Sequence, residues 1–303
     1  MPFTEADFAP VRRAMRAAVI GSKGFPSPPL PANAWKWMTG GQFLRARLVA
    51  RLSIARHVPR ERWARVAAAI ELVHAASLLH DDVIDGSLLR RHAPALWSVY
   101  GPRMAILAGD YLLAAALDLL DPTCPALRPA ITAIVGAARI TCTAEMEREL
   151  APQGGSGNRY TDEDLLLLAR DKTGPLFSAA AISTLPANAD PRRLRYWQET
   201  GFEIGLIYQM ADDIADNDPS SGKTPGRDAA RLLPTTASFA TAEMLRERVD
   251  GLVCSNPEPS AATVGERTAL TQYLCEDLLP ALRPLGAHSV LKRGASRKGR
   301  SRQ

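Results

Sequence analysis

The stretch ELVHAASLLHDDVID, residues 71–85, joins an apolar run to three aspartates in a DDxxD pattern. Proline is absent from residues 60–93, and helix-forming residues dominate them, so the sequence predicts a long helix that begins near Glu61 and ends at the acids. The stretch QMADDIAD, residues 209–216, repeats the pattern at the end of a second helix expected from about residue 192. This recurrence is the strongest signal in the sequence.

Each pattern places two carboxylates one helical turn apart, Asp81 with Asp85 and Asp212 with Asp216. Like charges at this spacing repel each other, and the negative end of the helix dipole adds to the cost. One such cluster alone would often be a solvated helix end. Two copies, each ending a long apolar helix, favour a hard divalent cation such as Mg²⁺, which binds through one or two carboxylates together with substrate phosphates.

Polar and basic residues accompany both clusters. His74 and Ser77 lie on the same helical stripe as Asp81. Arg90 and Arg91 follow the first cluster, either as salt-bridge partners or, with metal on the acids, as a clamp for a diphosphate. Near the second cluster, the amide of Gln209 lies one turn before Asp213. Between residues 37 and 291 the chain holds only two lysines, Lys172 and Lys223.

The rest of the chain predicts an all-α protein, a single-domain bundle of long antiparallel helices. Prolines separate the expected helices, and Lys172-Thr173-Gly174 is expected to end one of them at Pro175. A last helix is expected at about 265–283, and the spacing of Gly201 and Gly205 suits close approach of two helices. We expect one domain over residues 1–290 and a basic, disordered tail over 291–303.

Composition excludes several classes of protein. The chain has 303 residues, of which 46% are hydrophobic and 23% charged, so a sizeable core is available. The net charge of +5 comes from six cations in the last twelve residues, and the rest is near neutral, so a nucleic-acid-binding fold is not expected. The longest uncharged run, 173–189, contains two prolines and predicts no transmembrane helix. No secretory signal is visible and the four cysteines lack metal-type spacing, so a cytoplasmic setting is expected.

In combination, these residues resemble the trans-isoprenyl diphosphate synthases. The resemblance rests on residues 71–85 with Leu89-Arg90-Arg91, then ILAGDYLLA (106–114), Lys172-Thr173-Gly174, and YQMADDIAD (208–216) with Gly222-Lys223, all in the family's order. The matches run from about residue 40 to 236, roughly two-thirds of the chain.

The resemblance implies a helical bundle around a deep central cavity, usually a homodimer, that condenses an allylic diphosphate with isopentenyl diphosphate. It implies Mg²⁺ as cofactor and these roles: metal binding by Asp81, Asp82, Asp85, Asp212, Asp213 and Asp216; allylic diphosphate binding by Arg90, Lys172, Thr173, Gln209 and Lys223; isopentenyl diphosphate binding by Arg45, His74 and Arg91. Catalysis would then depend on Asp81, Asp82, Asp85, Lys172, Asp212, Asp213 and Lys223.

Two features bear on substrate and product. The family's early Gly-Gly-Lys-Arg-Leu-Arg-Pro element reads here Gly40-Gly41-Gln42-Phe43-Leu44-Arg45-Ala46, which removes two positive charges near the expected isopentenyl diphosphate site. This change leaves open low affinity for that substrate, a substitute cation, or a reaction that does not use it.

Ala76 and Ser77 are small and lie about one turn before Asp81, so geranylgeranyl diphosphate or a longer product is expected.

Three alternatives remain at this point. A terpene synthase that cyclises a preformed prenyl diphosphate would fit the depleted isopentenyl diphosphate site, although typical cyclases carry a different second metal motif. A non-catalytic subunit of a heteromeric synthase tends to lose the acids that are intact here. A metal phosphohydrolase using His80-Asp81 would need further histidines in a pattern that the chain does not show.

Overall fold

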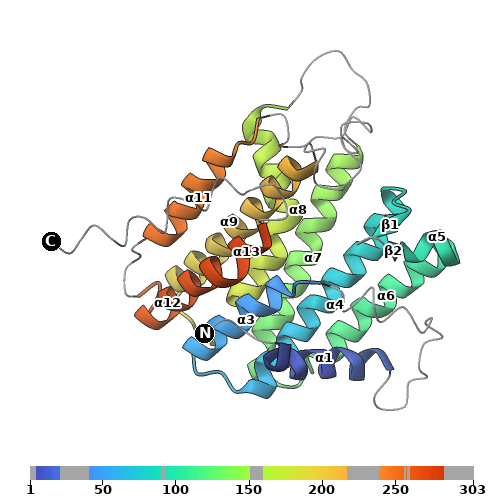
Figure 1. Ribbon diagram of the computed structural model, residues 1–303. Coiled ribbons are helices and arrows are strands. Elements are labelled where there is room, and N and C mark those ends of the chain that lie inside the picture. Colours follow the sequence, from blue (N-terminus) through green and yellow to red (C-terminus); the bar gives the residue numbers. More distant parts are fainter. Residues whose placement is uncertain are drawn as a thin grey trace. The chain divides into compact units, whose positions relative to one another are not determined.

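The computed structural model describes residues 5–20, 41–90, 93–150, 160–216, 236, 239–255, 257 and 260–282. Helices dominate these residues (Figure 1): α1 (Glu5–Ile20), α3 (Leu44–Ala55), α4 (Arg60–Ile84), α5 (Leu96–Tyr100), α6 (Pro102–Asp118), α7 (Arg128–Glu149), α8 (Asp162–Ile182), α9 (Pro191–Asp216), α11 (Ala242–Cys254), α12 (Val264–Gln272) and α13 (Leu279–Leu282). Within the described residues, the only strands are β1 (Leu89–Arg90) and β2 (Ala93–Pro94), an antiparallel pair. The all-α prediction is confirmed.

Both acid clusters end long helices, as the sequence predicts. The helix that carries the first, α4, begins at Arg60, and the helix that carries the second, α9, begins at Pro191. The last expected helix is also present, as α12, a π-helical turn η4 (Tyr273–Leu278) and α13 in succession. It begins with a capping box, in which Thr263 and Glu266 satisfy each other's backbone N–H groups.

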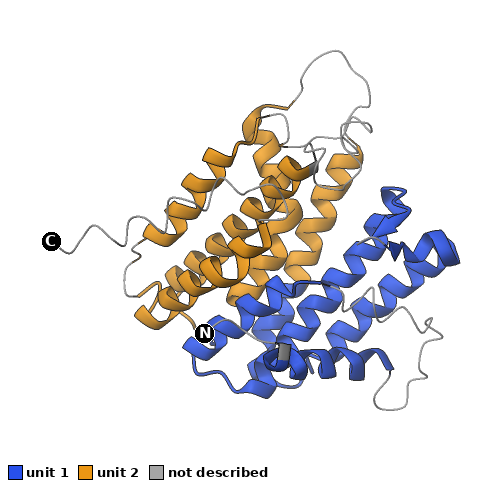
Figure 2. Ribbon diagram, viewed as in Figure 1, with its two compact units in different colours: residues 1–134, 183–188 blue, residues 135–182, 189–303 orange. Residues whose placement is uncertain are grey.

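The chain divides into two compact units (Figure 2): unit 1 is residues 1–134 with 183–188, and unit 2 is residues 135–182 with 189–303. In unit 1, α4 packs against α1, α3 and α6. Its core contains the fully buried side chains of Met15, Leu48, Ile70 and Leu112. The expected boundary at residue 290 and the basic tail lie outside the described residues.

Unit 2 is built on the pair α8 and α9, whose backbones touch through glycine. A Cβ atom on Gly205 would lie 2.4 Å from the Cα of Gly174, and one on Gly201 would lie 2.3 Å from the Cα of Ser178. Glycine at 201 and 205 permits this approach, because a Cβ atom at either position would overlap the backbone of α8. The prediction of close packing at Gly201 and Gly205 is confirmed.

The expected helix end at Pro175 is wrong, because α8 continues through Pro175 to Ile182. Proline removes the helical N–H donor to the carbonyl of Asp171, which normally bends or breaks a helix. Here the following turns bury Phe177 and Ala180 completely, and α8 packs along α9. Packing therefore outweighs the missing hydrogen bond, and Lys172 lies inside a helix rather than at its end.

No helix among the described residues is long and apolar enough to cross a membrane.

Candidate active site

The first aspartate cluster lies at the end of α4. Asp85 caps the helix, and its backbone N–H donates to the carbonyl of Asp81 at 2.7 Å. Asp81 and Asp85 are half-buried, whereas Asp82 is only 3% exposed. Because Asp81 and Asp85 are one turn apart and partly accessible, their oxygens are the ones that a ligand would meet first.

The buried member of this cluster, Asp82, is bound by Arg90 of β1. The Nε and Nη2 atoms of Arg90 donate to Asp82 Oδ1 at 2.9 and 2.5 Å. Burial alone would lower the pKa of the Arg90 guanidinium, but the hydrogen bonds to Asp82 and the neighbouring carboxylates raise this pKa above its ordinary value. Arg90 is therefore a salt-bridge partner of the acids, and its diphosphate-binding role stays a prediction.

His80, directly before the cluster, packs onto α6 where that helix has no side chain. A Cβ atom on Gly109 would lie 2.2 Å from His80 Nε2. That nitrogen lies 3.2 Å from the carbonyl oxygen of Ile106 and 3.5 Å from Asp110 Oδ1. Gly109 and Asp110 belong to the stretch 106–114, which contributes to the family resemblance. In the structure, the His80 ring packs over Gly109 and lies beside Asp110.

One to two turns before Asp81 on α4 lie the residues expected to bind substrate or limit chain length. His74 and Ser77 are half-buried, and the Ser77 hydroxyl donates to the His74 carbonyl at 2.9 Å. Ala76 is completely buried. Ser77 is therefore the more accessible of the two small residues.

The segment that departs from the family pattern has a structural explanation. Phe43 adopts a left-handed backbone conformation (φ 54°) before α3, is 5% exposed and packs against Phe8 of α1. The guanidinium of Arg12 lies 4.8 Å from the Phe43 ring centroid. In unit 1, therefore, Phe43 is a core residue, while the preceding Gln42 is exposed.

Arg45 follows on the first turn of α3 and is 9% exposed. The turn is held by Glu71 of α4, whose carboxylate accepts the N–H of Ala46 at 2.9 Å. A buried acid at a helix N-terminus stabilises the unpaired N–H groups there. This contact joins residues 25 apart in the chain, so no local sequence pattern predicts it.

The second cluster, in unit 2, also combines a partly accessible aspartate with a buried one. Asp212 is half-buried, while Asp213 is 5% exposed and both of its oxygens are occupied. Oδ1 accepts from Gln209 Nε2 at 2.7 Å, and Oδ2 accepts from the backbone N and hydroxyl of Thr236 at 3.0 and 2.5 Å. Gln209 Oε1 in turn accepts from the Thr173 hydroxyl at 2.6 Å. The sequence predicted that Gln209 and Asp213 share a face, but nothing in it pointed to Thr236.

Lys172 forms an ion pair that the sequence did not reveal. Its Nζ lies 2.7 Å from Glu145 Oε1 of α7, and Glu145 Oε2 also accepts from Arg148 at 3.3 Å. Two cations therefore share one carboxylate next to Thr173.

Some predicted residues lie outside the described residues, namely Arg91, Lys223 and the side chain of Asp216. Their roles stay predictions.

The acids suit Mg²⁺ in their chemistry. Among the described residues, no group of three His, Cys, Asp or Glu side chains is arranged to hold a metal by itself. Mg²⁺ does not require such a cage, since it retains waters and binds through one or two carboxylates plus substrate phosphates. The partly accessible oxygens of Asp81, Asp85 and Asp212 fit that description.

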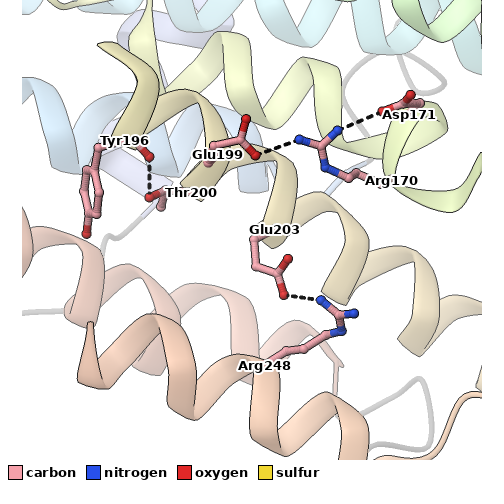
Figure 3. Close-up of polar contacts among 7 residues, drawn as sticks. All are labelled: Arg170, Asp171, Tyr196, Glu199, Thr200, Glu203 and Arg248. Carbon is pink, nitrogen blue, oxygen red and sulfur yellow. Dashed lines mark hydrogen bonds and ion pairs between the residues drawn. The ribbon is translucent and has the colours of Figure 1, made fainter. Parts of the chain in front are cut away.

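A groove elsewhere in unit 2 contains none of the predicted site residues. Tyr196, Glu199 and Glu203 of α9 and Leu252 of α11 are among its lining residues. Around it, Glu199 accepts from Arg170 and Glu203 from Arg248, both at 2.7 Å (Figure 3). These pairs tie α8 and α11 to α9, so this end of α9 serves packing.

Comparison with known proteins gives the chain its relatives. The profile of a family described as polyprenyl synthetase matches residues 30–253. A geranylgeranyl diphosphate synthase of Mycobacterium tuberculosis is 34% identical over 235 residues, which are 75% of this chain and 66% of that protein. A geranylgeranyl diphosphate synthase of Cereibacter sphaeroides is 30% identical over 290 residues, 89% of this chain and 96% of that protein. The match therefore spans slightly less than two thirds of the first relative and nearly all of the second.

Solved structures resemble the fold. A polyprenyl synthase from Caulobacter crescentus, complexed with calcium and isoprenyl diphosphate, has a TM-score of 0.66 at 24% identity, covering 96% of this chain and 88% of that one. A geranyltranstransferase from Thermotoga maritima has a TM-score of 0.67 at 22% identity, covering 92% and 97%. At these identities the likeness shows a shared all-α architecture.

Proposed function

The chain belongs to the polyprenyl synthetase family, and from this premise we propose that it is a Mg²⁺-dependent prenyltransferase that condenses an allylic diphosphate with isopentenyl diphosphate. The names of its relatives support this activity, since they are geranylgeranyl, farnesyl and nonaprenyl diphosphate synthases. The observation that carries the proposal is the pair of DDxxD clusters, each at the end of a long helix.

The acids and the basic residues divide the work. When bound, Mg²⁺ would neutralise the diphosphate and make it a better leaving group. Asp81, Asp82, Asp85 and Asp212 would hold it, with Asp213 and Asp216 in or near the second metal set. Arg90, Lys172 and Lys223 would add positive charge beside the allylic diphosphate, in the company of Thr173 and Gln209. In the ligand-free protein, Arg90 and Lys172 each pair with a carboxylate, so binding would exchange these partners for phosphate oxygens.

The reaction then needs no protein nucleophile. The allylic C–O bond breaks, and its electron pair leaves with the diphosphate. The double bond of isopentenyl diphosphate attacks the resulting carbocation and forms a new C–C bond. The departed diphosphate accepts the proton that is lost, which gives a linear diphosphate longer by five carbons. The residues of this chain contribute charge stabilisation and orientation.

Arg45, His74 and Arg91 would bind isopentenyl diphosphate. Because Phe43 is buried in the core and Gln42 is neutral, the expected isopentenyl diphosphate site has less positive charge than the family pattern. The same observation favours a second candidate, a synthase that cyclises a preformed prenyl diphosphate without isopentenyl diphosphate.

Three finer points complete the proposal. The small residues Ala76 and Ser77 support a product of geranylgeranyl length or longer. Family resemblance supports a homodimer. A cytoplasmic location belongs to the same proposal.

The test is to incubate the purified protein with Mg²⁺ and isopentenyl diphosphate, offering dimethylallyl, geranyl, farnesyl and geranylgeranyl diphosphates in turn. Mass spectrometry before and after phosphatase treatment should find linear diphosphates longer by five-carbon steps. Hydrocarbons or alcohols formed without isopentenyl diphosphate would instead establish the cyclase.

A matched pair of variants assigns any activity to the acids. Asp212→Asn should lose a hundredfold or more in rate, an order-of-magnitude expectation of about 10² for a lost charge-stabilising group. Asp118→Asn alters an exposed aspartate of α6 and should leave the rate unchanged. Equal activity of both variants would remove the second cluster from the mechanism. Unchanged substrates with the wild-type chain would point to a partner-dependent or non-catalytic subunit.

A further inference from the structure

Four side chains in unit 2 form a continuous hydrogen-bonded chain, Thr173–Gln209–Asp213–Thr236, whose links measure 2.6, 2.7 and 2.5 Å. Three of its members are nearly or fully shielded from water: Thr173 is 9% exposed, Asp213 5% and Thr236 0%. The close contact of Gly174 with Gly205 brings Thr173 of α8 within reach of Gln209 on α9. The sequence therefore places these four hydrogen-bonded side chains beside the glycine contact between α8 and α9.

The direction of every hydrogen bond in the chain is fixed at Asp213. Thr236 donates to Asp213 Oδ2 through both its N–H and its hydroxyl, and Asp213 Oδ1 accepts from Gln209 Nε2. Gln209 must therefore turn its NH₂ group toward the other oxygen. Since an amide carries one NH₂ and one carbonyl, the carbonyl of Gln209 faces Thr173, and the Thr173 hydroxyl must donate its single hydrogen to it.

The Thr173 hydroxyl consequently has only lone pairs left to offer. A diphosphate oxygen without a proton is also only an acceptor, so no hydrogen bond can form directly between the two. A lysine ammonium or a water molecule can donate to Thr173 instead.

We propose that Asp213, anchored by Thr236, is a positioning residue that makes Thr173 an acceptor-only group in the diphosphate site. Thr173 then holds a donor that lies between itself and the diphosphate. This inference rests on the proposed function, because it needs a diphosphate beside Thr173, and it specifies how one predicted substrate-binding residue acts.

Asp213→Asn provides a sharp test, because it should reverse the direction in which hydrogen bonds are donated between Asp213, Gln209 and Thr173. The carbonyl of an asparagine would keep the two Thr236 donors, so its NH₂ group would face Gln209. Gln209 would turn over and offer its own NH₂ group to Thr173. Thr173 would then accept from Gln209, and its hydrogen would become available to a phosphate oxygen.

The experiment measures binding of inorganic pyrophosphate in EDTA by calorimetry, with and without Thr173→Val, in the wild-type and Asp213→Asn backgrounds. In the wild type, Thr173→Val should change Kd by less than about twofold, because no hydrogen bond to the anion is lost. In Asp213→Asn, the same substitution should weaken binding about tenfold or more, the usual cost of a hydrogen bond to a charged group. Comparing within each background cancels the change in net charge.

Two controls guard the result. Thr271→Val removes an exposed hydroxyl that bonds within α12, to the carbonyl of Arg267, and should have no effect in either background. Thermal unfolding of each variant shows that it is folded.

A tenfold loss from Thr173→Val in the wild type would overturn the inference, as would equal effects in the two backgrounds or no pyrophosphate binding by the wild type. The elongation assay on the same preparations separates the two proposals. Elongation with the wrong binding pattern rejects only the role of Thr173. The expected pattern without elongation rejects only the proposed function.

Discussion

The hydroxyl of Thr236 shows how much one buried side chain can contribute. Thr236→Val keeps the shape of the side chain but removes one of two donors to Asp213 Oδ2. We expect urea unfolding to show a loss of about 1–3 kcal/mol, the cost of leaving a buried acceptor poorly satisfied.

Asp213→Ala provides the control for this prediction. In that background, Thr236→Val should cost close to nothing, whereas Thr236→Ser, which loses only a methyl group, should cost the same in both backgrounds. Equal costs of Thr236→Val in the two backgrounds would contradict the contact.

Ser77 and Ala76 should respond differently to a bulky substitution, because only Ser77 is partly accessible. Ser77→Phe should keep the protein folded and shorten the longest product seen by mass spectrometry. Ala76→Phe should instead overpack a completely buried site and destabilise the protein by about 1–3 kcal/mol. Ser77→Ala is the matched control. An unchanged product ladder in folded Ser77→Phe would remove Ser77 from chain-length control.

Gln42 is the position at which positive charge can be restored without disturbing the core. Gln42→Lys should lower the KM for isopentenyl diphosphate about tenfold, as expected for a new charge-assisted hydrogen bond, and leave the KM for the allylic substrate unchanged. Gln42→Met has similar length and no charge, and should have no such effect. An unchanged KM in Gln42→Lys would mean that this segment does not face that substrate.

At the scale of the elements, the contact between α4 and α6 depends on the absence of a side chain at Gly109. Gly109→Ala would drive His80 from its seat, so it should destabilise the protein although alanine favours helices by about 1 kcal/mol. In a His80→Ala background the clash disappears, and the same substitution should become stabilising by about that amount. Chemical unfolding of the four proteins measures this change of sign. The same sign in both backgrounds would show that His80 is not held there.

The elements also show where sequence reasoning succeeds and where it fails. The long helices ending in acids could be predicted, because apolar periodicity and proline-free segments are local signals. The passage of α8 through Pro175 could not, since it depends on burial of Phe177 against a helix distant in sequence. Phe43 is a similar case: its left-handed backbone and its contact with Phe8 are set by tertiary packing.

At the scale of the whole molecule, Mg²⁺ should serve the reaction rather than the fold. Each unit has its own apolar core, and the described residues contain no three-ligand metal group. EDTA should therefore abolish elongation but leave the melting temperature of the ligand-free protein unchanged within about 1 °C. Added Mg²⁺ should restore activity. A large fall in melting temperature on chelation would indicate a structural metal.

In the candidate site, too, residues in local motifs could be predicted and contacts between distant parts of the sequence could not. The aspartates, Gln209 and the basic residues could be named from motifs, because their spacing along the chain carries the signal. Their partners could not be named, since Glu145 reaches Lys172 and Thr236 reaches Asp213 only through folding. Arg90 lies between these cases: its position just after the acids indicates a salt bridge as one of two roles, and the structure contains that pair.

The glycine contact between α8 and α9 has a consequence for mutational scanning. In a library selected for activity alone, substitutions at Gly174, Gly201 and Gly205 should be depleted as strongly as those at the aspartates. A larger residue at these positions would prevent the close packing of α8 and α9. The amount of folded protein in the cell should therefore fall. Variants of the partly accessible Asp81, Asp85 and Asp212 should instead accumulate as intact, inactive protein. Selection for abundance in parallel would therefore distinguish positions that shape the enzyme from positions that perform its chemistry.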